Sequence, residues 1–396
     1  MFAASIALAL ALGAVNAQLL VTTDSDTRLR AGPSEDHNRV CVLPAGVPLW
    51  ALGKQGQWYH VRLCPSLDAW VYDTTVKSTG QSQPPALANI GSMSLSGCET
   101  GSEVQFSLNR AVPFRILPQL DPPGLIVDLF DCVLAAYWIR QFPDDRLIKQ
   151  AQPWQEATGW VRVRIDLDSP AVVGYRAYYR GDSTLVIEVR RPYAGPGLGG
   201  KTIVLDPGHG GTDSGAVSAG GLPEEKVNLA IALRAAEMLT AGGARVVLTR
   251  ASDTQVGPAG GSQAQELEAR VQVGVKQKAD LFVSIHNNAT GGGTNASVAG
   301  TETYYWTPFS HLLARRLCQA TSTALGTSHR FVAWRPFHVL RDTDCPRALI
   351  ECAYMSNPSE AKYMAQAEFV ERAALGIVAG IKQFVAETAL YPSGAQ

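Results

Sequence analysis

The chain has 396 residues, 46% of them hydrophobic, and a formal net charge of −1. This length predicts two or three domains with packed cores. The balanced charge provides neither the basic surface that nucleic acid requires nor a polybasic patch for an anionic membrane. After the N-terminus, no apolar run is long enough to cross a bilayer, so no stable membrane span is expected.

The N-terminal residues 1–17 read MFAASIALALALGAVNA. Their apolar run has the length of the hydrophobic region of a signal peptide and is too short to span a bilayer. The small residues before position 18 suit cleavage after Ala17, although no positive residue precedes the run. We therefore predict a signal peptide over residues 1–17 and export to the periplasm or the extracellular cell wall. A buried N-terminal helix is the alternative.

Seven cysteines are spread along the chain without a CxxC or other metal-binding spacing. In an exported chain, Cys41 with Cys64 and Cys98 with Cys132 are candidate disulfides. Buried free thiols are equally compatible with the sequence, which does not fix the pairing.

The first part of the mature chain, residues 19–78, has short apolar runs separated by turns, which predicts a small all-β barrel. It resembles the bacterial SH3-like domains of cell-wall enzymes in the string LRAGPS at residues 29–34, in Gly46 and Trp58, and in AWV at residues 69–71. Arg28 departs from that family, which usually has asparagine there. We interpret the aromatic residues of this part as core and assign no ligand site to them.

The middle part, residues 86–193, follows a polar, Pro-rich stretch and ends in a Gly/Pro-rich one. Its apolar or alternating runs of strand length predict a second all-β domain. These runs are SEVQFSLN, GLIVDLFD, GWVRVRIDL and STLVIEVRR. In pattern and position this part resembles AMIN-type β-domains, and a β-sandwich of another family is the alternative.

The third part, residues 200–386, alternates between strand-like and helix-like runs. Strands are predicted at residues 201–206, 244–249, 280–286 and 347–355, and helices at 227–243, 266–279, 310–325 and 367–385. Such alternation predicts an α/β fold with a mixed sheet flanked by helices. The whole chain is therefore expected to be multidomain, with an α/β domain preceded by two all-β domains.

Three candidate metal ligands lie at the ends of these predicted elements. His209 follows the strand at 201–206, His286 closes the strand at 280–286, and Glu224 starts the helix between them. Sites in open α/β sheets form beyond the carboxyl ends of strands, where both histidines lie. Two imidazoles, one carboxylate and an open position for water are the donor set of a catalytic zinc site, so we predict Zn²⁺ as the cofactor.

The loop around His209 reads DPGHGG and has little bulk. Gly208, Gly210 and Gly211 let the backbone turn sharply and leave room in front of a metal for a bulky substrate. We hypothesise that Asp206 orients His209 as its hydrogen-bond partner. An ordinary turn role for Asp206, just before Pro-Gly, is the alternative.

Glu351 lies inside an otherwise apolar predicted strand, RALIECAYM. A carboxylate there is unfavourable unless it is used or paired, and desolvation raises its pKa toward the range of a general base. We therefore predict that Glu351 is the catalytic residue, which takes a proton from the attacking water and gives it to the leaving amine. A salt bridge to Arg341 or Arg347 is the alternative.

Six motifs, in this order, resemble the zinc-dependent N-acetylmuramoyl-L-alanine amidases of the amidase family 3 type. They are LDPGHGGTDSGA, PEEKVNLAIAL, VVLTRASD, ADLFVSIHNNA, GTETYY and HVLRDTDCPRALIECAYMSNPSE. The resemblance implies zinc ligands at His209, Glu224 and His286 and a catalytic glutamate at Glu351.

The same resemblance separates two adjacent glutamates. The family places its ligand four residues before the position of Asn228, which selects Glu224. Glu225 then stands where the family usually has lysine, a small departure.

The resemblance implies a peptidoglycan hydrolase that cleaves the amide between N-acetylmuramic acid and the L-alanine of the stem peptide. Peptidoglycan is the implied partner, and the self-contained domains favour a monomer. Two alternatives stay open: a catalytically inactive peptidoglycan-binding protein on the same fold, and a zinc peptidase that cuts within the stem peptide. The presence of all four site residues favours the hydrolase.

Overall fold

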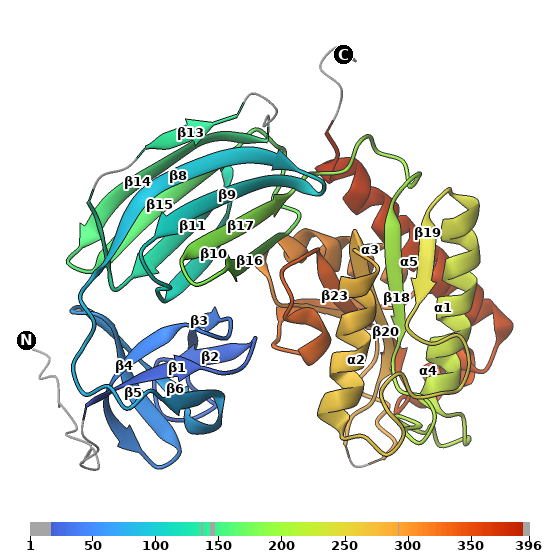
Figure 1. Cartoon of the computed structure of the whole chain (residues 1–396). Coiled ribbons are helices and arrows are strands. Elements are labelled where there is room, and N and C mark those ends of the chain that lie inside the picture. The colour runs from blue at the N-terminus through green and yellow to red at the C-terminus, as the bar shows by residue number, and fades with distance from the viewer. Residues whose placement is uncertain (1–16, 136–137, 143–146, 292, 391–396) are drawn as a thin grey trace, which may run out of the picture. The chain divides into compact units, whose positions relative to one another are not determined.

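The computed structural model describes residues 17–135, 138–142, 147–291 and 293–390 (Figure 1). The predicted signal peptide, apart from Ala17, lies outside the described residues. Among the described residues, no helix has the length and apolar character that crossing a membrane requires.

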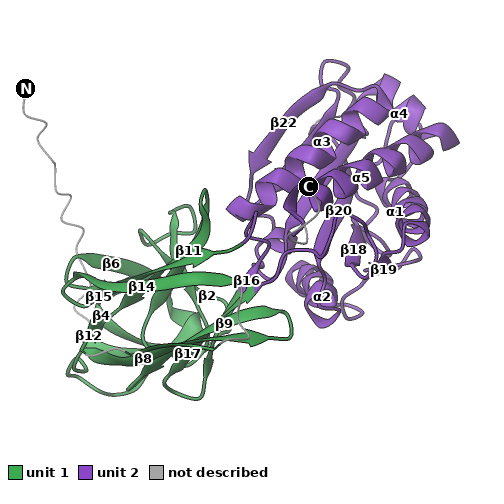
Figure 2. Ribbon diagram, turned by 90° about the horizontal axis from the view of Figure 1, so that it is seen from above, with its two compact units in different colours: residues 1–168, 176–189 green, residues 169–175, 190–396 purple. Residues whose placement is uncertain are grey.

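The chain divides into two compact units, shown in different colours in Figure 2. Unit 1 comprises residues 1–168 and 176–189, and unit 2 comprises residues 169–175 and 190–396. Unit 1 is built from strands, whereas unit 2 mixes strands and helices.

The N-terminal part of unit 1 is a single antiparallel sheet with the strand order β3-β2-β6-β5-β4-β1-β7. Its elements are β1 (Gln18–Thr22), β2 (Thr27–Arg30), β3 (Arg39–Leu43), β4 (Pro48–Gln55), β5 (Trp58–Cys64), β6 (Leu67–Tyr72), η1 (Asp73–Thr75) and β7 (Val76–Ser78). Alternate residues such as Leu49 and Ala51 in β4 are buried, because successive side chains of a strand point to opposite faces. The all-β prediction for this part is confirmed.

The second part of unit 1 contains two further sheets, β10-β11-β15-β14 and β12-β8-β9-β17-β16, with β13 beside β8. Its strands are β8 (Ala88–Cys98), β9 (Gly101–Leu108), β10 (Phe114–Leu120), β11 (Pro123–Phe130), β12 (Cys132–Leu134), β13 (Ile139–Gln141), β14 (Ile148–Ala157), β15 (Trp160–Leu167), β16 (Tyr175–Arg180) and β17 (Thr184–Arg190). Phe106, Val127, Val163 and Ile187 are buried, which gives these sheets an apolar interior.

All seven cysteines lie in the described residues and are free thiols. Neither Cys41 with Cys64 nor Cys98 with Cys132 forms a disulfide, so the structure follows the alternative of free thiols. Burial raises the pKa of Cys41 to about 12, which leaves that thiol protonated and unreactive at neutral pH.

Unit 2 is built on a mixed sheet with the strand order β19-β18-β20-β23-β21-β22. Its strands are β18 (Thr202–Pro207), β19 (Arg245–Leu248), β20 (Leu281–Asn288), β21 (Thr301–Tyr305), β22 (His329–Trp334) and β23 (Arg347–Tyr354). Its helices are α1 (Glu224–Ala241), α2 (Gln263–Lys276), η2 (Pro308–Ser310), α3 (His311–Leu325), η3 (His338–Leu340), α4 (Pro358–Met364) and α5 (Ala367–Thr388). Neighbouring strands run parallel except for β21 against β23, so the α/β prediction is confirmed.

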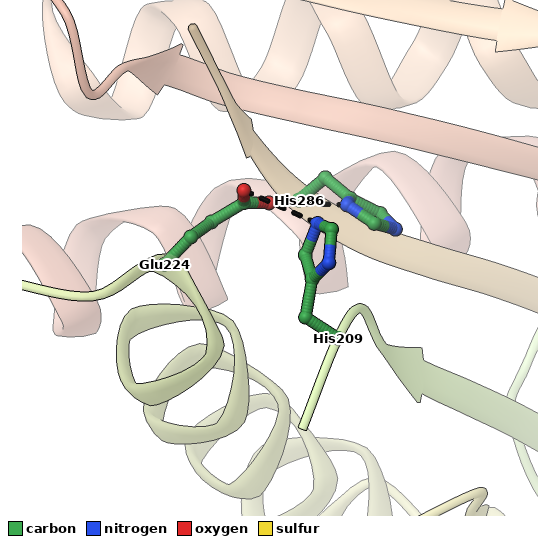
Figure 3. A group of neighbouring side chains, drawn as sticks. All are labelled: His209, Glu224 and His286. Atoms are coloured by element: carbon green, nitrogen blue, oxygen red, sulfur yellow. Dashed lines mark hydrogen bonds and ion pairs between the residues drawn. The ribbon is translucent and has the colours of Figure 1, made fainter. Parts of the chain in front are cut away.

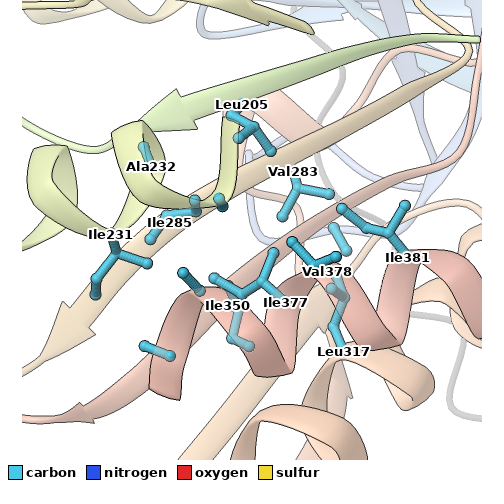
Figure 4. Packing of buried hydrophobic residues seen from close by; sticks show 14 of the residues in the cluster. Leu205, Ile231, Ala232, Val283, Ile285, Leu317, Ile350, Ile377, Val378 and Ile381 are labelled. Atoms are coloured by element: carbon cyan, nitrogen blue, oxygen red, sulfur yellow. The ribbon is translucent and has the colours of Figure 1, made fainter. Parts of the chain in front are cut away.

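Helices α1, α3 and α5 cover one face of this sheet (Figure 4). Ile231 of α1, Leu317 of α3 and Ile377 of α5 pack in one cluster with Val283 and Ile350 of the sheet. These buried aliphatic side chains supply the main hydrophobic stabilisation of unit 2.

Helix α2 lies on the opposite face, as Figure 2 shows, and we call this the α2 face. Val271 of α2 packs there against Phe282 of β20 and Leu349 of β23. Because side chains alternate along a strand, His286 and Glu351 lie on this same face. The sequence pattern did not predict β21 or β22, which are short and stand at the side of the sheet farthest from β19.

Helices α3 and α5 approach closely where α5 carries Gly376 and Gly380. A Cβ atom at position 376 would lie 2.5 Å from the Cα atom of Thr321, and one at position 380 would lie 2.8 Å from the Cα atom of Leu317. Glycine at these two positions therefore allows the backbones to pack at this distance.

We expect Gly376→Ala to destabilise unit 2, although alanine has the better helix propensity by about 1 kcal/mol. Overpacking against the α3 backbone costs about 1–3 kcal/mol and outweighs that gain. Faster amide hydrogen exchange in α3 and α5 would report the loss. Leu375→Ala, at the neighbouring exposed position, is the matched control and is expected to leave exchange unchanged. Slower exchange in the Gly376→Ala variant would contradict the packing account.

Candidate active site

His209, Glu224 and His286 come together at one edge of the unit 2 sheet (Figure 3). Each offers one ligand atom, and these atoms all lie within 4.8 Å of one another. His209 Nε2 lies 3.2 Å from Glu224 Oε2, and His286 Nδ1 lies 3.1 Å from Glu224 Oε1. Two imidazoles and one carboxylate that converge in this way fit the donor set of a catalytic zinc ion.

The sheet brings these residues together because β18 and β20 are adjacent and parallel. The loop that carries His209 begins at the carboxyl end of β18, and His286 lies near the carboxyl end of β20. Glu224 is the first residue of α1, where the helix dipole favours a negative charge.

The small residues of the His209 loop have a steric cause. A Cβ atom at Gly208 would lie 2.1 Å from Cε1 of His286, and one at Gly215 would lie 2.6 Å from Oε2 of Glu224. His209 itself has a φ of 61°, in the left-handed region that histidine enters more readily than bulkier residues. The loop can therefore meet the other two ligands only if glycine occupies positions 208 and 215.

The carboxylate of Glu224 is 4% exposed and is held by donors from several segments. Burial by itself would raise its pKa, but hydrogen bonds and charge from His209 and His286 outweigh burial and hold that pKa well below its usual range. Its further donors are Ala216 N at 3.0 Å, Asn228 Nδ2 at 3.0 Å and Asn287 N at 3.2 Å. Glu224 is therefore held in one position in its ionised form.

The hydrogen-bond partner of His209 is Asp213, whose Oδ2 lies 2.8 Å from His209 Nδ1. The hypothesis that Asp206 fills this role is wrong. Asp206 lies in β18 with its side chain on the α2 face, where it pairs with Arg270 at 2.8 Å. The usable signal in the sequence was a carboxylate four residues after the histidine in the same tight loop.

Two buried arginines hold the backbone of this loop. Arg270 donates to the carbonyl oxygens of Pro207 at 2.9 Å and His209 at 2.8 Å. Arg250 donates to Pro207 at 3.0 Å and to Gly208 at 2.9 Å. Because the guanidinium groups are planar and carry several donors, they fix consecutive carbonyl groups at once. No pattern in the sequence predicted this role for Arg250.

Glu351, on strand β23, lies beside the three converging residues because it pairs in register with His286 on the neighbouring strand β20. It is partly buried, and its Oε2 has no hydrogen-bond partner among the described residues. Burial raises the pKa of Glu351 to about 7; the charges of Glu224 and Glu302 add to this rise, and His286 opposes it. A carboxyl group with this pKa is suited to accept and return a proton at neutral pH.

The structure does not form the two alternative arrangements that the sequence allowed. Arg347 is fully buried and pairs with Asp344 at 2.9 Å, Arg341 donates to the backbone carbonyl of Pro336, and Oε2 of Glu351 has no hydrogen-bond partner among the described residues. Glu225 is buried, but it is not among the residues that converge with the two histidines.

Comparison with known proteins gives matches for both ends of the chain. Residues 203–383 match the family described as N-acetylmuramoyl-L-alanine amidase, and residues 25–77 match the bacterial SH3 domain. N-acetylmuramoyl-L-alanine amidase LytC of Bacillus subtilis is 38% identical over 182 residues, which are 45% of this chain and 34% of that relative. The chain thus spans about a third of the length of LytC.

Other relatives are covered over most of their length. The germination-specific N-acetylmuramoyl-L-alanine amidase of Bacillus subtilis is 33% identical over 205 residues, which are 50% of this chain and 84% of the relative. A solved structure, the catalytic domain of the N-acetylmuramoyl-L-alanine amidase CwlV from Bacillus (Paenibacillus) polymyxa, is 36% identical over 46% of this chain and 97% of its own, with a TM-score of 0.42. Because the germination-specific amidase is 33% identical and is covered over 84% of its length, the chain belongs to the N-acetylmuramoyl-L-alanine amidase family.

Proposed function

We propose that this protein is a zinc-dependent peptidoglycan hydrolase. It cleaves the amide between N-acetylmuramic acid and the L-alanine of the stem peptide. The observation that carries the proposal is the convergence of His209, Glu224 and His286 beside Glu351, whose Oε2 has no hydrogen-bond partner in the part of the chain that the structure describes. Membership of the amidase family supports the same reaction.

In this proposal His209, Glu224 and His286 hold one Zn²⁺ ion. When bound, the ion supplies a Lewis acid for the amide carbonyl group and lowers the pKa of water to near 7. Asp213 would keep the proton of His209 on Nδ1, which leaves the lone pair of Nε2 available for the metal ion. The buried, ionised carboxylate of Glu224 needs no deprotonation before it acts as a ligand.

Glu351 carries out the proton transfers. Its free Oε2 accepts a proton from the water whose oxygen forms the new bond to the amide carbon. When the carbon–nitrogen bond breaks, Glu351 returns that proton to the leaving nitrogen. The products are the lactyl carboxylate on muramic acid and a stem peptide with a free amine on its L-alanine.

We also propose the organisation and destination of the chain. Residues 1–17 act as a signal peptide, residues 19–78 form an SH3-like domain, residues 86–193 an AMIN-like domain and residues 200–386 the catalytic domain. The mature protein acts outside the cytoplasm on peptidoglycan, as a monomer. The cell-wall substrate of the family supports export.

Incubation of the zinc-loaded mature chain with purified peptidoglycan tests the function. We expect mass spectrometry to find stem peptides that begin with a free L-alanine amine, and none after EDTA treatment. Glu351→Gln should bind zinc normally and lower the release rate by about 10²–10⁴-fold, because general acid–base catalysis contributes that much. Shorter peptides cut within the stem would indicate a peptidase. No release despite zinc binding would indicate an inactive binding protein.

The role of Asp213 gives a separate prediction about metal affinity. We expect Asp213→Asn to weaken Zn²⁺ binding by about 10–100-fold, as the loss of a partner that orients a ligand usually does. Competition with a chromophoric chelator measures this affinity. Asp253→Asn, which changes another carboxylate bonded to the same loop, at Gly211 N, is the matched control with an expected change below that range. Equal losses in both variants would point to a general effect on the loop.

A further inference from the structure

Unit 2 carries a cluster of aromatic side chains on and beside its two unpredicted strands. Three of them are well exposed: Phe331 at 37% and Trp334 at 51% on β22, and Phe337 at 40% just before η3. Tyr304 on β21 and Trp306 directly after it lie against them and are partly exposed. We call these five residues the aromatic surface.

The rings of the aromatic surface hold one another in place. Trp306 and Trp334 are stacked, with ring centroids 4.1 Å apart and planes 20° apart, and Trp334 Nε1 donates to the carbonyl of Trp306 at 2.8 Å. Tyr304 packs edge-on against Phe337 at 5.1 Å and against Phe331 at 6.0 Å. Little side-chain entropy is therefore left to lose when a ligand binds here.

One end of the aromatic surface, at Phe331, lies beside the row of Glu302 and Glu351, whereas Trp334 pairs with Tyr305, three positions farther along β21. Glu351 on β23 pairs in register with His286 on one side and with Glu302 on β21 on the other. Glu302 in turn pairs with Phe331 on β22 and accepts a hydrogen bond from the hydroxyl of Tyr304 at 2.7 Å. Since adjacent strands lie about 4.8 Å apart, β22 runs about 10 Å from the strand of Glu351.

Clustering distinguishes these residues from other exposed apolar side chains of unit 2. Leu233 of α1 and Leu375 of α5 are also exposed, but they stand on helices that cover the opposite face of the sheet. Scattered exposed leucines are ordinary in soluble proteins, whereas a contiguous aromatic patch beside a site marks a binding surface.

We propose that the aromatic surface binds the glycan strand of peptidoglycan by stacking sugar rings on its aromatic faces. This inference rests on the proposed function. The amide that is cleaved joins a glycan to a peptide, so both extend away from Glu351. A pyranose ring with equatorial substituents presents a flat C–H face that packs on an aromatic ring. The stem peptide begins with L-alanine, whose single methyl group offers no such face.

Two substrates separate the glycan from the peptide in a test on the full mature chain with zinc. One is a glycan strand that carries stem peptides, and the other is a single N-acetylmuramoyl peptide. We expect Trp334→Ala and Phe337→Ala to raise KM for the strand by about tenfold, as the loss of a central aromatic contact does, and to leave kcat within about twofold. KM for the single-sugar substrate should change by less than about twofold for both variants.

Two further variants are controls. Trp334→Phe keeps an aromatic face and should retain most of the affinity for the strand, which separates stacking from a folding defect. Leu375→Ala, on the opposite face, should behave like the unaltered chain. Equal KM values for the strand in Trp334→Ala and Leu375→Ala would overturn the proposal. Equal KM increases for both substrates would also overturn it, because the loss would then not depend on the presence of the glycan strand.

A binding measurement tests the glycan surface independently of amidase activity. Calorimetry with peptide-free glycan strands needs no turnover, and Trp334→Ala should weaken their binding by about tenfold relative to Leu375→Ala. If the unaltered chain releases no stem peptide but shows this difference, the proposed function fails and the glycan surface stands. If both variants bind the strands equally, the glycan surface is refuted even when the amidase is active.

Discussion

The arrangement of the site in unit 2 depends on the hydrogen bonds that the buried carboxylate of Glu224 accepts. It receives hydrogen bonds from both candidate histidine ligands and from the backbone of the loop and of β20. A charge that is 4% exposed is strongly unfavourable unless such donors surround it. Because those donors come from the loop after β18 and from β20, while Glu224 itself starts α1, these three segments must meet at this one group.

The rest of the site follows from that meeting point. Glycines at positions 208 and 215 make room for the side chains of His286 and Glu224. Arg250 and Arg270 hold the loop by donating to its backbone carbonyl groups. Helices α1, α3 and α5 cover one face of the sheet, and His286 and Glu351 lie on the other, the α2 face. Oε2 of Glu351 has no hydrogen-bond partner there among the described residues, an unfavourable arrangement that the proposed proton transfer would explain.

Much of unit 2 was predictable because its strands and helices have strong periodicity. The start of α1 at Glu224, directly after a proline, was expected from sequence. The partner of His209 was predicted wrongly, although Asp213 follows it in the same loop, because the left-handed turn at His209 directs its ring toward Asp213 and away from Asp206. Strands β21 and β22 were missed because TETYY and HRFVAW are short and β22 has no buried residue, so their pairing depends on neighbours distant in sequence.

We propose that His209, Glu224 and His286 hold one zinc ion beside Glu351. Anomalous diffraction at the zinc absorption edge, from crystals of the zinc-loaded mature chain, would locate this ion. We expect one strong peak in unit 2, about 2.0–2.2 Å from a nitrogen of each histidine and an oxygen of Glu224. A peak bound by Glu225 in place of Glu224, or zinc bound only elsewhere on the chain, would contradict it.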